Sequence, residues 1–122
     1  MKSVVTWFEI PVSDIKESKA FYEHVFQFEM SDMRVKDEKL AVFPATEVSG
    51  ALLEAPGYTG PDRAVVLYLN IPDTIAEVLT RAEEKGGKTV TVRTVIEENI
   101  GWVATFADLD GNIIGLYESA QR

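Results

Sequence analysis

The stretch FADLDGNIIGLYES, from Phe106 to Ser119, contains residue types that could bind a cation or move a proton. Asp108 and Asp110 are carboxylates separated by one residue, and paired carboxylates can do either kind of chemistry. However, Asp, Gly and Asn are also the residues that a tight turn selects. The apolar run that follows them is typical of a strand. We therefore expect DLDGN to form a turn between two strands rather than a catalytic pair.

Other reactive side chains are few. The chain has no cysteine, which excludes disulfides, thiolate zinc sites and a cysteine nucleophile. Its one histidine, His24, lies away from the apolar stripe of a predicted helix, so we expect it to face solvent. Glu9 stands among apolar residues beside Trp7, a setting in which a carboxylate can act in proton transfer. We favour the alternative for Glu9, a solvated or hydrogen-bonded carboxylate, paired for example with Arg34 or Arg93.

Composition limits the class of protein. A chain of 122 residues with 46% hydrophobic residues fits one compact domain. The formal net charge of −8 opposes binding to phosphate backbones, so we expect no nucleic-acid partner. No apolar run approaches the length of a membrane span, and the opening residues do not form a signal peptide. We therefore expect a soluble, cytoplasmic protein without a membrane partner.

The two halves of the sequence resemble each other. WFEIPVSDI (7–15) is similar to VLYLNIPDT (66–74), and VSGALLEA (48–55) is similar to NIIGLYES (112–119). The offsets within these pairs are 59 and 64 residues, and both pairs occur in the same order, which indicates a duplication. We expect a single domain over 1–122, built of modules 3–55 and 64–119 and joined by a Pro- and Gly-rich linker at 56–63.

Each half is predicted to contain a strand, a helix and three further strands. Apolar residues recur with a helical period from Ile15 to Phe26 and from Ile75 to Ala82. Ser13 or Asp14 can cap the first helix, and the glycines of KGG end the second. The three later strands are expected at 28–35, 39–45 and 49–55 in the first half, and at 88–96, 101–107 and 112–118 in the second.

Alternation along the strands separates two faces of the predicted sheet. One face is apolar and is expected to pack against the helices. The opposite face, which we call the open face, is mixed in character and is the face that a binding cavity would use. Its expected members are Trp7, Glu9 and Pro11; Ser49, Ala51 and Leu53; Val66, Tyr68 and Asn70; and Ile113, Gly115 and Tyr117.

A tandem βαβββ duplication that opens with FEIPVSDIKESKAFYEHVF and closes with FADLDGNIIGLYE resembles the vicinal oxygen chelate superfamily. That superfamily includes glyoxalase I, extradiol dioxygenases, methylmalonyl-CoA epimerase and bleomycin-resistance proteins. The resemblance covers about residues 3 to 119 and implies an α+β fold whose two modules form a curved mixed sheet with a concave cup. It also implies a homodimer. Gln27 departs from the pattern, because a glycine commonly follows that helix.

In metal-dependent members, the resemblance implies four His, Glu or Gln ligands from four strands. The matching positions in this sequence are Trp7, Ala51, Val66 and Gly115. None of these side chains offers an oxygen or imidazole lone pair to a divalent ion. Changing the register by two residues adds only Glu9 as a good ligand, while Glu54 and Glu118 lie an odd step away and face the helices. We therefore expect no metal and no other cofactor.

The sequence thus favours a glyoxalase/bleomycin-resistance-like protein that binds an unidentified small molecule in the cup without the family's metal centre. The expected aromatic wall comprises Trp7, Tyr68, Trp102 and Tyr117, with core or dimer packing as the alternative. Asn70 either orients a ligand or caps the backbone. A competing hypothesis is a lyase, isomerase or dioxygenase-like enzyme, metal-dependent or using Glu9 as acid/base. A third is a subunit whose open face is covered by a partner chain.

Overall fold

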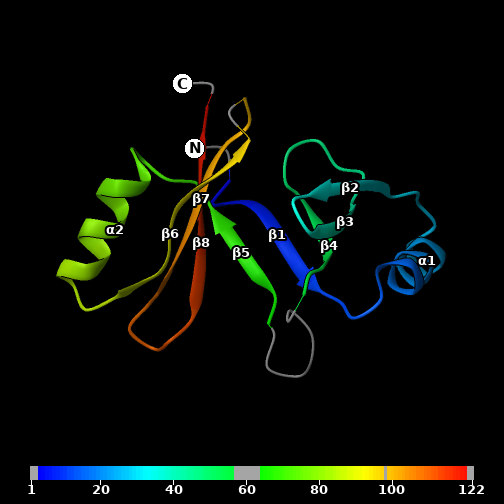
Figure 1. The fold of residues 1–122 in the computed structure, drawn as a ribbon, viewed down its shortest axis with the longest axis horizontal. Helices are drawn as coiled ribbons and strands as arrows, with labels where there is room; N and C mark the ends of the chain where they lie inside the picture. The colour runs from blue at the N-terminus through cyan, green and yellow to red at the C-terminus, as the bar shows by residue number, and fades with distance from the viewer. Residues whose placement is uncertain (1–2, 57–63, 98, 121–122) are drawn as a thin grey trace. The chain divides into compact units, whose positions relative to one another are not determined.

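The computed structural model describes residues 3–56, 64–97 and 99–120. A strand, a helix and three strands follow one another in each half, so the predicted α+β class with two βαβββ modules is confirmed (Figure 1). Apart from Pro56, the predicted linker lies outside the described residues. The elements are β1 (Val5–Pro11), α1 (Ile15–Phe26), β2 (Ser31–Val35), β3 (Glu38–Val42), β4 (Ser49–Glu54), β5 (Val66–Leu69), α2 (Ile75–Glu84), β6 (Lys88–Glu97), β7 (Gly101–Ala107) and β8 (Ile113–Ser119).

The described residues fall into two compact units. The N-terminal module contains residues 7–56 with 64–65, and the C-terminal module contains residues 3–6 with 66–97 and 99–120. In this division the boundary lies inside β1, at Trp7. Asn70 ties residues 3 and 4 to the C-terminal module, because its backbone N–H donates to Val4 O at 2.8 Å and its side-chain amide donates to Ser3 O at 2.6 Å.

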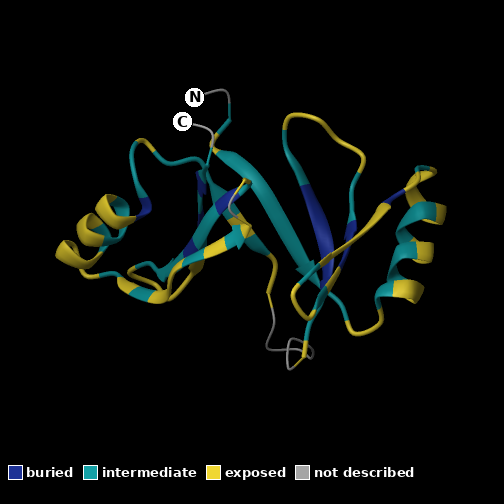
Figure 2. Ribbon diagram, turned by 45° about the horizontal axis from the view of Figure 1, so that its top comes forward, coloured by how far each residue is buried: buried dark blue, intermediate teal, exposed yellow. Residues whose placement is uncertain are grey.

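The N-terminal module is a mixed four-stranded sheet with α1 on one face. Its strand order is β2-β3-β4-β1, with β1 and β4 parallel and the other pairs antiparallel. Met30, Ala41 and Leu52 form the buried centre between sheet and helix, and Ile15 and Tyr22 pack against them. In Figure 2 the helix shows exposed residues along one side, while β4 is largely buried. This arrangement confirms the predicted apolar face of the first half.

Helix α1 begins and ends at identifiable signals. The Asp14 carboxylate accepts the backbone N–H groups of Lys16 and Glu17 at 3.1 Å each, so Asp14 is the cap of the two candidates. Gln27 ends the helix in the left-handed conformation, with φ 57°, where glycine is the usual residue. Its side-chain amide donates to His24 O at 2.6 Å, which stabilises that conformation. His24 is exposed, as expected.

The C-terminal module repeats this design. Its strand order is β5-β8-β7-β6, with β5 and β8 parallel and the other pairs antiparallel. Ile75 of α2 is fully buried against Ala104 and Leu116, and Gly86, with φ 101°, ends the helix region as predicted. Within the described part of the chain, no helix is long and apolar enough to cross a lipid bilayer.

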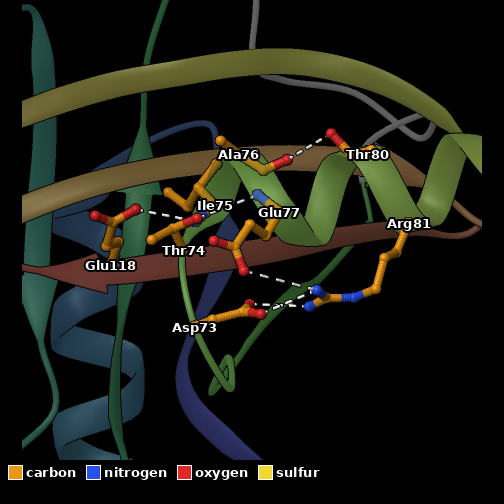
Figure 3. A network of polar contacts seen from close by, with 8 residues as sticks. All are labelled: Asp73, Thr74, Ile75, Ala76, Glu77, Thr80, Arg81 and Glu118. Atoms are coloured by element: carbon orange, nitrogen blue, oxygen red, sulfur yellow. Dashed lines mark hydrogen bonds and ion pairs between the residues drawn. The ribbon is translucent and has the colours of Figure 1, made fainter.

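Polar contacts fix the start of α2 (Figure 3). The Thr74 hydroxyl accepts the Glu77 N–H at 3.2 Å. Arg81 donates two hydrogen bonds of 2.9 Å to the Asp73 carboxylate, and the guanidinium holds the pKa of Asp73 below its usual value. The Glu118 carboxylate reaches from β8 and accepts the Ile75 N–H at 2.9 Å.

The duplication extends to this last contact. In the N-terminal module, Glu54 at the end of β4 accepts the Ile15 N–H at 2.9 Å, as Glu118 accepts that of Ile75. A helix leaves its first N–H groups without intrahelical acceptors, and a carboxylate there also interacts favourably with the helix dipole. Both carboxylates therefore point to the helix face, as the odd step in the sequence predicted.

Candidate functional site

The open face of the N-terminal module is confirmed as a face separate from the helix side. Trp7, Glu9 and Pro11 on β1 pair in register with Ser49, Ala51 and Leu53 on β4. Leu40, Ala51 and Leu53 form a buried cluster with Trp7, Val35 and Val42, and none of these residues belongs to the cluster under α1. The face is therefore apolar at its centre, with polar groups at specific points.

Glu9 is oriented by its neighbour on the same strand. The Trp7 indole N–H donates to Glu9 Oε2 at 3.1 Å, and both residues are half-buried. The Glu9 carboxylate is therefore hydrogen-bonded, and Trp7 sets its position. Arg93, one of its suggested partners, contacts Trp102 and Glu118 within the C-terminal module.

The sequence analysis missed a second carboxyl on this face. Glu38 begins β3, shares the parity of Leu40 and pairs with Val35, which places it on the open face. Partial burial, reinforced by the nearby Asp37 carboxylate, raises the pKa of Glu38. The alternation of side chains along the strand would have placed Glu38 on the open face, but the predicted strand began one residue later, at Lys39.

In the C-terminal module, the open face is organised around Gly115. Tyr68 on β5 and Thr105 on β7 are the register partners of Gly115 on the two sides. A Cβ atom built on Gly115 would lie 2.5 Å from Tyr68 Cδ2, so the tyrosine ring fills the space that a side chain at position 115 would need. Tyr117 is half-buried on the same face, and its hydroxyl donates to Ile100 O at 2.8 Å.

The remaining predicted residues lie outside this group. Asn70 uses its amide to hold Ser3, which matches the backbone-capping alternative. Trp102 pairs in register with Glu118 and packs with Ile75, Ala104 and Leu116 on the helix face. The Arg93 guanidinium lies 4.0 Å from the centre of the Trp102 ring. The structure therefore brings Tyr68 and Tyr117 to one face of the module and Trp102 to the other.

The four positions that match the family's metal ligands are poorly suited to a divalent ion. Trp7 and Val66 are half-buried, and Ala51 is fully enclosed by its apolar cluster. Gly115 has no room for a side chain unless Tyr68 moves. Among the residues that the structure describes, no group of three or more His, Cys, Asp or Glu side chains is placed to hold a metal ion. The donor chemistry of these positions does not fit a metal of the family type.

The DLDGN segment is a turn, as predicted. Asp108 Oδ1 accepts the backbone N–H groups of Asp110 and Asn112 at 2.9 Å each. Its other oxygen accepts the Asn112 side-chain amide at 3.0 Å. These bonds, those from Asn112 above all, lower the pKa of Asp108. Gly111 takes φ 86°, the conformation for which a turn selects glycine. Asp108 is therefore committed to the turn.

Comparisons with known proteins identify the family of this chain and agree with its fold. A family model described as the Glyoxalase/Bleomycin resistance protein/Dioxygenase superfamily matches residues 4–116, whereas no curated protein matches the sequence. Methylmalonyl-CoA epimerase from Streptomyces coelicolor, in complex with 2-nitronate-propionyl-CoA, has a TM-score of 0.70 and 18% identity, covering 98% of this chain and 96% of that one. The epimerase from Mycobacterium tuberculosis has a TM-score of 0.67 and 16% identity, covering 98% and 92%. At such identities the likeness shows the fold alone.

Proposed function

Because this chain belongs to the Glyoxalase/Bleomycin resistance protein/Dioxygenase superfamily, we propose that it binds a small organic molecule without the family's metal centre. Each module offers its own open-face contacts to such a molecule: Trp7 in the N-terminal module, and Tyr68 and Tyr117 in the C-terminal module. The observation that carries the proposal is the position of the Tyr68 ring over Gly115. An aromatic surface stands where a metal-dependent relative needs a ligand side chain.

The chemistry of these faces favours a ligand with a flat or apolar part. Aromatic rings stack on planar groups, and the half-buried side chains of Val35 and Val42, which pack in the same cluster as Trp7, add apolar contact area. The Trp7–Glu9 hydrogen bond supplies a fixed polar point beside the indole. The net charge of −8 opposes a polyanion. A coenzyme A thioester, whose nucleotide carries phosphates, should therefore bind less well than a neutral or cationic molecule of similar size.

Two tryptophan variants test the proposal. One replaces Trp7, on the open face of the N-terminal module, and the other replaces Trp102, on the helix face of the C-terminal module. Trp7→Ala is expected to weaken binding of an organic ligand by at least about tenfold, because a stacking surface and the partner of Glu9 are lost together. Bleomycin and methylmalonyl-CoA, taken from the names of family members, are the first probes, and isothermal titration calorimetry measures the dissociation constants.

Trp102→Ala is the matched control, since that ring lies on the helix face. It should leave the affinity within about twofold once circular dichroism shows that both variants are folded. Equal losses in the two variants, or no binding of either probe by the wild-type chain, would count against the proposal.

An enzyme remains the second candidate, because the Trp7 N–H holds the Glu9 carboxylate in a defined position on the open face. In that case Glu9 gives or takes a proton from the bound molecule. The variant Glu9→Gln separates the two functions. An enzyme keeps its affinity for the ligand and loses turnover, whereas a binding protein shows no turnover in either form. A homodimeric state and a cytoplasmic location stay predictions.

A further inference from the structure

One enclosed hydroxyl, that of Thr105, lies on the open face of the C-terminal module. Thr105 Oγ1 is shielded from solvent and has no hydrogen-bond partner among the residues that the structure describes. The hydroxyls of Thr80 and Thr94, in contrast, donate to Ala76 O at 2.9 Å and to Val92 O at 2.8 Å. Enclosed polar atoms in proteins are nearly always paired, and an exception often marks a place where a water or a ligand binds.

The neighbours of Thr105 point to a ligand. Tyr68, Gly115 and Thr105 are register partners on three adjacent strands, so they form one row across the open face. Gly115 contributes no side chain, and the Tyr68 ring lies over it, on the side of β5 that faces β7. The Tyr68 ring is therefore the side chain nearest to the space above Gly115, and a flat ligand could occupy that space once the ring has moved.

The strand beyond Thr105 is irregular at the same level. Thr91 on β6 is the register partner of Thr105, and the pairing of β6 with β7 shifts on both sides of it, between Thr89 and Thr91 and between Thr91 and Thr94. Such irregularities re-aim side chains and are common beside functional sites. The row of Tyr68, Gly115 and Thr105 therefore borders a part of the sheet where the regular pairing of β6 with β7 is interrupted.

We propose that the Thr105 hydroxyl is the hydrogen-bonding anchor of the ligand site and that the Tyr68 ring moves aside when the ligand enters. This inference rests on the proposed function and specifies its ligand class: a neutral, flat molecule that carries a carbonyl or similar oxygen. The Thr105 O–H donates to that oxygen, and the flat part of the ligand lies over Gly115. A neutral molecule also avoids repulsion from the net charge of −8.

Benzamide and toluene form a matched pair of probes, because they share a ring and differ in the carbonyl-bearing group. Their dissociation constants are measured by NMR titration of the full chain, using the resonances of Thr105 and Tyr68. Benzamide is expected to bind the wild-type chain and Thr105→Ser equally. It should bind Thr105→Val about five- to tenfold more weakly, since one hydrogen bond is lost. Thr94→Val, which removes a hydroxyl outside the row, is the control and should bind benzamide normally, while toluene should not distinguish the variants.

The outcomes separate this inference from the proposed function. Equal affinity of the wild-type chain and Thr105→Val for benzamide overturns the role of Thr105 and leaves the proposed function standing. A second outcome has the same meaning. If bleomycin or methylmalonyl-CoA binds in a way that depends on Trp7, but benzamide leaves the Thr105 resonances unchanged, the role of Thr105 is overturned and the proposed function stands. If none of these molecules perturbs either open face, both proposals fail.

A second measurement needs no ligand. In the unliganded chain, Thr105→Val is expected to unfold at the wild-type temperature or above, because the removed hydroxyl has no hydrogen-bond partner in the described part of the chain. Thr94→Val should unfold at a lower temperature, because its hydroxyl is bonded to Val92 O. If Thr105→Val is destabilised as much as Thr94→Val, the hydroxyl is paired within the protein and the inference is wrong.

Discussion

Glu118→Ala is expected to lower the free energy of unfolding by about 3 kcal/mol. The Glu118 side chain is 9% exposed, accepts the Ile75 N–H and lies 3.6 Å from Arg93 Nε. Its removal leaves the first N–H of α2 without its acceptor in the structure and takes the carboxylate partner from Arg93. Chemical denaturation followed by circular dichroism measures the change.

The duplication supplies the comparison for this variant. Glu54→Ala removes the equivalent acceptor for Ile15, but the Glu54 side chain is 28% exposed and its nearest cation, Lys39, is 3.9 Å away. Water can replace part of what is lost, so the expected cost is about 1 kcal/mol. Glu118→Gln keeps an oxygen for the Ile75 N–H, so its loss of unfolding free energy should lie between those of Glu118→Ala and Glu54→Ala. If the two alanine variants lose the same free energy of unfolding, burial of the capping carboxylate does not determine how much it contributes to stability.

Gly101→Ala is expected to destabilise the protein by at least about 3 kcal/mol. Gly101 opens β7 with φ 145°, and a Cβ atom there would lie 2.2 Å from the backbone oxygen of Glu118. Two separate costs therefore add, one for a backbone conformation that L-residues avoid and one for moving β8 away from β7. The same denaturation experiment measures the loss.

Gly111→Ala separates these two costs. Gly111 also has positive φ, at 86°, but a Cβ atom built on it would meet nothing within 4 Å. Its replacement should therefore cost only about 1 kcal/mol. A Gly101→Ala variant no less stable than Gly111→Ala would mean that β7 and β8 are not packed together at this point as the structure has them.

Periodic patterns predicted the parts of the fold that depend on local chemistry. The apolar stripe from Ile15 to Phe26 and the cap at Asp14 gave the first helix correctly, because a helix forms where one face can be buried and its first N–H groups find acceptors. Alternation correctly placed Leu52 against α1 and Ala51 on the opposite face. The resemblance of the two halves predicted the second module from the first.

Features that depend on pairing between strands could not be read from the sequence. Trp102 was grouped with Tyr68, although the register of β7 on β8 places its side chain beside Glu118 on the helix face. The same register brings Thr105 next to Gly115, and no local pattern in GWVATFA signals that neighbour. Asn70 likewise holds Ser3 and Val4 through bonds that no local pattern signals, because the bonded residues are more than half of the 122-residue chain apart in sequence.

Metal binding by the purified chain tests the central claim most directly. The protein is incubated separately with Zn²⁺, Ni²⁺, Mn²⁺ and Fe²⁺ and dialysed, and its metal content and unfolding temperature are then measured. With an aromatic ring over Gly115 and no lone-pair donor at the other three positions, we predict well below one ion per chain and no rise in the midpoint. Roughly one retained ion per chain, with a raised midpoint as mass action requires of a native-state ligand, would contradict the account.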